Sequence, residues 1–288
     1  MLEKIMTAIA DLFCAGLTKI AEWISSSAVV SFTGDYQKLW NISTGVADDI
    51  FVPVAALFVV IYFFITITDK VSFEQLSFEQ VMKELIKLIA GLYLVTNSCN
   101  IMVGCINVGN GLLKQVSNYI TSYGVNSALT SIPTADAMGT QFVDIAKAAG
   151  GGVLVASLMS IIVIVLLLVL IIEFLIIKVI CIIRLLDICM KTAVAPLAIC
   201  DTFNGNILQS HAMSFIRSFL ALCLQGVFIH LTVCFLPLFL NGSFNSLFAT
   251  GNIFDFMLDM LELLVVGIAS VAIVFKSGAA AKEVMGAR

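Results

Sequence analysis

The stretch from Val153 to Ile172 reads VLVASLMSIIVIVLLLVLII, contains no charged residue and ends in an unbroken aliphatic run. A helix of about 20 apolar residues is long enough to cross the hydrocarbon core of a bilayer. The stretch follows the glycine run Gly150–Gly152, and glycine runs commonly separate helices. We therefore predict that Val153–Ile172 is a membrane-spanning helix.

The composition of the whole chain agrees with a membrane protein. Its 288 residues are 60% hydrophobic and 12% charged, whereas soluble domains are roughly 45–50% apolar and about 25% charged. A soluble fold could not hide this much apolar surface, which excludes a water-soluble globular enzyme. The net charge of −4 argues against a nucleic-acid-binding protein with a broad basic face.

Further apolar stretches bring the predicted architecture to an all-α, polytopic membrane protein with about five spans. The predicted spans are Ile50–Thr68, the first two-thirds of Leu88–Leu113, Val153–Ile172, Phe219–Leu240 and Phe256–Phe275. Leu2–Ile24 has its apolar residues at helical spacing, which predicts an amphipathic helix lying in the interface. Thr192–Cys200 is too short to cross and contains Pro196, so a re-entrant or surface segment is predicted there.

Local signals predict two helix starts. Asp48 and Asp49 precede the first span and Pro53 lies near its beginning, which is typical of a helix N-terminus. The repeated sequence Ser72–Gln75 and Ser77–Gln80 places a Gln three residues after each Ser, the signature of a capping box.

These assignments divide the chain into segments that alternate between the two sides of the membrane. They are 1–47 (amphipathic helix and outer segment), 48–113 (first two spans with a short inner helix), 114–152 (outer loop), 153–190 (long third span), 191–217 (inner re-entrant or surface segment) and 218–288 (last two spans and inner tail).

The distribution of Lys and Arg predicts an outer N-terminus and a cytoplasmic C-terminus. The inner segments hold Lys70, Lys83, Lys87, Arg184, Lys191, Arg217, Lys276, Lys282 and Arg288. The outer segments hold Lys4, Lys19, Lys38, Lys114 and Lys147. Cytoplasmic loops carry the excess of basic residues in most membrane proteins. The predicted location is thus the cell membrane. Because the number of predicted spans is odd, the two ends of the chain lie on opposite sides of it.

Three acidic residues share one face at the start of the last span. Asp255, Asp259 and Glu262 lie at i, i+4 and i+7. Acids stabilise a helix N-terminus at headgroup level, which is the simpler interpretation. The alternative is that Asp259 and Glu262 line a water-filled passage, because buried acids are otherwise costly in a membrane.

A second group of charges lies at the inner end of the third span. Glu173, Lys178, Arg184 and Asp187 form a mixed-charge strip, and Arg217 stands at the entry to the fourth span. The strip marks either the inner boundary of the bilayer or a docking face for a cytoplasmic partner or neighbouring subunit. His230, in mid-span, is either a proton relay or a hydrogen-bonding residue between helices.

No catalytic, metal-binding or nucleotide-binding motif is present: G-x-S-x-G, the P-loop and H-E-x-x-H are all missing, and none of the eight cysteines is spaced as C-x-x-C. The sequence therefore predicts neither an enzyme nor a cofactor, and an energy-coupling ATPase has to be a separate chain.

Short motifs around the third and fourth spans resemble those of a known family. They are Arg184-Leu-Leu-Asp187, Ala195-Pro-Leu-Ala-Ile199 and Phe215–Gln225, joined by Leu76–Lys87 and the ending Lys276–Gly286. Together with the hydropathy layout, they resemble the TrbL-like polytopic subunit of conjugative type IV secretion systems. The version found in integrative elements of Gram-positive bacteria is the most similar.

The resemblance implies a scaffold or channel subunit in the inner-membrane complex of a DNA-transfer apparatus. It implies partners among the other secretion subunits, including cytoplasmic ATPases, and assembly with further copies of itself. It also implies transient contact with single-stranded DNA. The outer loop offers only Lys114 and Lys147 for such contact, so binding would be weak or would depend on several copies.

A small-solute permease or ion channel is the alternative function. It would use Glu262, His230 and Glu173 as polar sites inside the membrane. Five spans, however, cannot be divided into the paired inverted halves of typical secondary transporters.

The predicted orientation can be tested with epitope tags at both ends. We expect protease added to intact cells to remove the N-terminal tag and to spare the C-terminal tag. Digestion of both tags from the same side would contradict an odd number of spans.

Overall fold

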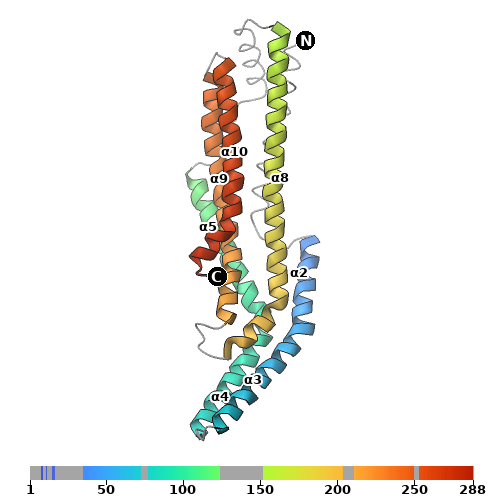
Figure 1. Cartoon of the computed structure of the whole chain (residues 1–288), viewed down its shortest axis with the longest axis vertical. Coiled ribbons are helices and arrows are strands. Elements are labelled where there is room, and N and C mark those ends of the chain that lie inside the picture. Colours follow the sequence, from blue (N-terminus) through green and yellow to red (C-terminus); the bar gives the residue numbers. More distant parts are fainter. Residues whose placement is uncertain are drawn as a thin grey trace. The chain divides into compact units, whose positions relative to one another are not determined.

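The computed structural model describes Ala8, Asp11, Ala15, Gly16 and residues 35–72, 77–123, 152–203, 211–249 and 253–287. Every regular element in these ranges is a helix (Figure 1). The all-α prediction is therefore confirmed. Apart from those four residues, the predicted amphipathic helix Leu2–Ile24 lies outside the described residues, as do residues 124–151 of the predicted outer loop.

The described helices supply the predicted number of spans. They are α2 (Asp35–Val46), the π-helix η1 (Ala47–Phe51), α3 (Val52–Ser72), α4 (Phe78–Thr96), α5 (Ser98–Ser122), α8 (Gly152–Ile199), the 3₁₀ helix η2 (Cys200–Phe203), α9 (His211–Ala249) and α10 (Ile253–Val284).

Four helical stretches of the described chain are long and apolar enough to cross a membrane: Gln37–Asp69, Ser160–Ile199, His211–Phe235 and Met257–Val284. The pair α4 and α5 passes the same test jointly but is bent by 61°, so it is a broken span or a re-entrant loop. The total of four to five agrees with the prediction.

The chain forms two compact units. Unit 1 comprises Met1–Val29, Leu112–Ile182 and Val227–Ser277, and unit 2 comprises Val30–Gly111, Ile183–Gly226 and Gly278–Arg288. Helices α5, α8, α9 and α10 each contribute residues to both units. A charged residue on one of these helices can therefore belong to either unit.

Unit 2 has a well-defined apolar core. Its buried members come from most helices of the unit: Ala55, Val59, Val95, Met102, Ile106, Ile188, Ala195, Ile199, Cys200, Phe219, Leu222 and Cys223. Helices α3 and α4 lie side by side, and η2 packs against both (Figure 1). The end of α8 is thus held inside the core of unit 2.

The first span begins earlier than the acidic residues predict. The helix starts at Asp35, and Asp48 and Asp49 lie in the π-helix η1 instead of at a helix N-terminus. Pro53 has no N–H for the carbonyl four residues before it, which weakens the α-helical bonding pattern here. The N–H of Val52 bonds the carbonyl of Ala47, five residues back, which is the π-helical arrangement.

The third span ends later than predicted, since α8 continues to Ile199 with Pro196 inside it. Thr192–Ile199 is therefore part of the long helix and not a separate re-entrant or surface segment. A proline in a helix costs about 3 kcal/mol, but only one turn of helix follows Pro196. Its neighbours Ala195 and Ile199 are buried in the core of unit 2, which offsets this cost.

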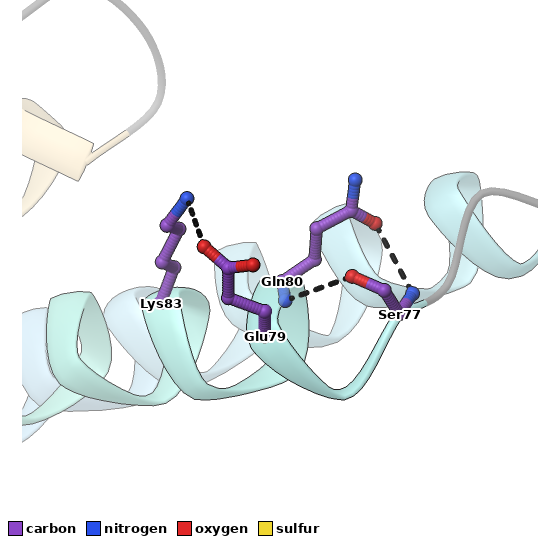
Figure 2. Close-up of polar contacts among 4 residues, drawn as sticks. All are labelled: Ser77, Glu79, Gln80 and Lys83. Carbon is purple, nitrogen blue, oxygen red and sulfur yellow. Dashed lines mark hydrogen bonds and ion pairs between the residues drawn. The ribbon is translucent and has the colours of Figure 1, made fainter.

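The second Ser-x-x-Gln repeat starts α4, as predicted. The Ser77 hydroxyl accepts a hydrogen bond from the Gln80 backbone N–H, and the Gln80 side chain accepts one from the Ser77 N–H (Figure 2). This capping box satisfies two backbone donors at the start of the helix. Glu79, inside the same first turn, forms an exposed ion pair with Lys83 one turn further along, with an N–O distance of 3.0 Å. Ser72 of the earlier repeat is the last residue of α3, and the other residues of that repeat lie outside the described residues.

Replacing Ser77 by Ala is expected to lower the free energy of unfolding by about 1 kcal/mol, since one N-terminal N–H of α4 loses its acceptor. Denaturant titration of the purified protein in detergent micelles measures the change. Ser77→Asp, which keeps an acceptor, serves as the control and should retain most of the stability. Equal midpoints for the wild type and Ser77→Ala would show that the cap does not contribute.

Candidate functional site

The predicted site residues do not form one cluster. Glu173, Asp259 and Glu262 belong to unit 1, whereas Arg184, Asp187 and Arg217 belong to unit 2. The mixed-charge strip of the third span is also not one exposed surface, because Glu173 and Arg184 are only 6% and 5% exposed. Asp187 is half-buried and Arg217 is exposed. The acidic group and the group around Arg184 therefore belong to different units.

In unit 2, the Arg184 guanidinium links α8 to the backbone of α9. Its Nε donates to the carbonyl of Leu222 at 2.8 Å, and a terminal nitrogen donates to the carbonyl of Cys223 at 3.2 Å. A carbonyl oxygen has two lone pairs, so it can accept from a side chain in addition to its helical N–H. The buried positive charge is thus hydrogen-bonded to two backbone carbonyls of α9.

Gly226 provides the space for this guanidinium. A Cβ at position 226 would overlap the terminal atoms of Arg184. A glycine inside a helix costs roughly 0.5–1 kcal/mol relative to alanine, so a glycine here needs a packing reason. The close approach of Arg184 supplies that reason, and the two residues act as a matched pair.

In unit 1, Glu173 and Gly267 form a similar pair between α8 and α10. The carboxyl of Glu173 occupies the space where a Cβ of residue 267 would lie. The Ser270 hydroxyl donates to the Gly267 carbonyl at 2.7 Å. One carboxyl oxygen of Glu173, Oε1, has no hydrogen-bond partner among the described residues. A buried, incompletely bonded carboxyl is costly, which makes Glu173 a candidate functional group.

The acidic face of α10 is only partly buried. Glu262 is exposed, and Asp259 is half-buried with Oδ2 lacking a partner in the described part of the chain. The side chain of Asp255 lies outside the described residues. The two interpretations of this face, helix N-terminus or water-filled passage, both remain predictions.

His230 is buried in α9 and contacts its own helix. Its Nε2 lies 3.5 Å from the sulfur of Cys234, one turn further along. Its Nδ1 has no partner within the described ranges. The sequence suggested a hydrogen bond from His230 to a neighbouring helix. The Nε2 atom instead contacts Cys234 within α9.

A second polar contact between α8 and α9 was not predicted from the sequence. The Lys191 ammonium donates to the Ser218 hydroxyl at 2.6 Å. Lys191 follows Arg184 by seven residues and Ser218 precedes Leu222 by four, so each pair shares one helix face. Once Arg184 is known to contact α9 near Leu222, these two spacings indicate that Lys191 and Ser218 face each other. Within the described helices, no three His, Cys, Asp or Glu side chains gather as a metal site.

Replacing Gly226 by Ala is expected to lower the free energy of unfolding by about 3 kcal/mol, because the added methyl displaces a buried charge from its acceptors. Thermal unfolding in detergent measures the effect. Adding Arg184→Met to Gly226→Ala removes the clash and should restore part of the loss.

The control is Gly104→Ala in α5, where a Cβ would meet no atom within 4 Å. It should be neutral or slightly stabilising. If Gly226→Ala unfolds at the same temperature as Gly104→Ala, the guanidinium does not pack against Gly226.

More than half of the chain matches a known protein family. A family model described as TrbL/VirB6 plasmid conjugal transfer like protein matches residues 18–196. No curated protein and no solved structure matches the chain. The matched region covers more than half of the sequence and includes Glu173, Arg184 and Lys191 of α8. The chain therefore belongs to the TrbL/VirB6 plasmid conjugal transfer-like family, and it is a multi-pass membrane component of conjugal transfer.

Proposed function

We propose that this chain is an integral membrane scaffold or channel subunit of a conjugative type IV secretion apparatus. The family match over residues 18–196 is the observation that carries the proposal. In the proposed assembly, several copies of the chain associate with one another and with other secretion subunits, including cytoplasmic ATPases. The N-terminus lies outside the cell and the C-terminus lies in the cytoplasm.

The surface of the first span supports a role in assembly. Only 11% of the apolar window within Gln37–Asp69 is buried inside the chain. Large side chains such as Leu57, Phe64 and Ile65 are more than half exposed. In water this would be a large apolar patch, and such patches mark membrane or protein interfaces. The span is therefore free to contact lipid and neighbouring subunits.

The buried polar contacts support a rigid frame. Arg184 is bonded to α9, and Glu173 is packed against α10. Charged side chains cost several kcal/mol inside a membrane, so they hold their positions only where the protein compensates them. A fixed frame of this kind suits a scaffold that presents exposed charges, among them Arg217 and Glu262, to partners. The proposal assigns the chain no catalytic step.

Deletion of the gene should reduce conjugal transfer by several orders of magnitude, because the apparatus would lack a membrane subunit. The measurement is the number of transconjugants per donor, with the wild-type chain supplied in trans to restore transfer. Arg217→Gln and Glu262→Gln are expected to restore it only partly, at unchanged abundance in the membrane, if these charges contact partners.

The matched control is Glu79→Gln, which removes an exposed carboxylate that forms an ion pair with Lys83 on the same helix. It should restore transfer fully. Co-purification of the secretion ATPases with the wild-type chain tests the partnership directly. Normal transfer in a clean deletion strain would overturn the proposed function.

A further inference from the structure

Three helices of unit 2 bring together a small group of polar and basic side chains near their ends. Lys191 lies two turns before the end of α8 at Ile199, and Ser218 lies two turns after the start of α9 at His211. Lys282 lies in the last turn of α10. On each of the three helices, the group therefore lies within about two turns of a helix end.

Direct contacts show that the three helices meet here. Lys191 and Ser218 join α8 to α9 through a 2.6 Å hydrogen bond. Gly278 joins α10 to α9, since a Cβ there would lie 3.2 Å from the Gln225 amide nitrogen. Lys282, one turn beyond Gly278, is close enough to Lys191 for their charges to interact. The group therefore spans α8, α9 and α10 and is not a chance run on one helix.

Lys191, Lys282 and the nearby Asp187 together carry a net positive charge. Lys191 and Lys282 repel each other, and Asp187, one turn before Lys191, is the acidic residue that acts on Lys191. One carboxylate against two ammonium groups leaves a net positive charge. Each ammonium has three donor hydrogens, and Lys191 uses one of them on Ser218. Lys282 is exposed and extends the group to the surface.

We propose that Lys191, Ser218 and Lys282 form a binding site for the phosphate of an anionic phospholipid. A phosphate supplies the missing negative charge, and its oxygens accept hydrogen bonds from both ammonium groups. Basic pockets between transmembrane helices on the cytoplasmic side commonly bind anionic headgroups. The site rests on the orientation proposed above: with the C-terminus in the cytoplasm, this group lies in the cytoplasmic leaflet, where anionic lipids provide the ligand. The site does not depend on the proposed role in conjugation.

The test uses the purified full-length chain in neutral detergent, with phosphatidylglycerol added as the probe and phosphatidylcholine as the uncharged comparison. Phosphatidylglycerol should raise the unfolding temperature, and native mass spectrometry should show it retained on the protein. Phosphatidylcholine should do neither. Lys282→Gln should weaken phosphatidylglycerol binding about fivefold, which corresponds to about 1 kcal/mol for one basic residue at an anionic surface.

Lys276→Gln is the matched control, because Lys276 is exposed on the same helix and its loss changes the net charge equally. It should bind phosphatidylglycerol like the wild type. Among the described residues, the Lys282 side chain makes no hydrogen bond to another helix, so the unfolding temperature of Lys282→Gln without lipid should stay unchanged. Lys191→Gln should weaken lipid binding as well, with a loss of basal stability from the broken Ser218 bond.

Several outcomes would overturn the proposal. Equal binding by Lys282→Gln and Lys276→Gln would show that net charge, not this site, attracts the lipid. Full stabilisation by inorganic phosphate would identify a site for free phosphate and not for a lipid. Protection by single-stranded DNA but not by phosphatidylglycerol would identify a nucleic-acid contact. Normal conjugal transfer in a clean deletion strain would overturn the proposed function but would leave the lipid result unaffected, so the two proposals are tested separately.

Discussion

A charge buried inside a membrane protein has to find its hydrogen-bond partners within the protein, because lipid offers none. Arg184 meets this requirement with the carbonyls of Leu222 and Cys223 on α9. These bonds fix both the distance between α8 and α9 and the register of one helix against the other. The remaining contacts of unit 2 are compatible with this register: Gly226 leaves space for the guanidinium, and Lys191 reaches Ser218 further along the same two helices.

Glycine has the same function at both buried charges of α8. Gly226 accommodates Arg184 in unit 2, and Gly267 accommodates Glu173 in unit 1. Association of helices in lipid relies on close packing, since apolar side chains gain little by leaving the bilayer for another apolar surface. Small residues therefore decide where two helices can approach closely. In this chain they decide where a long charged side chain can be enclosed.

The chain encloses the hydrogen-bonded charge of Arg184 and leaves many apolar side chains exposed. The span Gln37–Asp69 leaves most of its apolar window exposed, whereas the window of His211–Phe235 is 44% buried. A larger share of α9 than of the first span is therefore buried within the chain, and the first span is available for lipid or neighbouring subunits. For a member of the TrbL/VirB6 family, this arrangement separates the residues that maintain the fold from those that can contact partners.

Local sequence was sufficient for the helical class, the approximate number of spans and the capping box at Ser77. Hydropathy and capping depend on residues close together in the chain, so their patterns are visible without a structure. The family was also evident from short motifs near Arg184 and Pro196. The exact helix ends were less predictable: burial in the core of unit 2 carries α8 past Pro196, and this burial comes from residues far away in the sequence.

Only the tertiary structure determined which residues the charged side chains contact. Arg184 lies 38 positions from Leu222, and Lys191 lies 27 positions from Ser218, which is far beyond any helical period. From the sequence, Glu173, Arg184 and Asp187 formed one strip, yet the fold buries the first two against different helices. The physical reason is that periodicity determines which residues share a face of one helix, whereas the packing of helices determines what that face contacts.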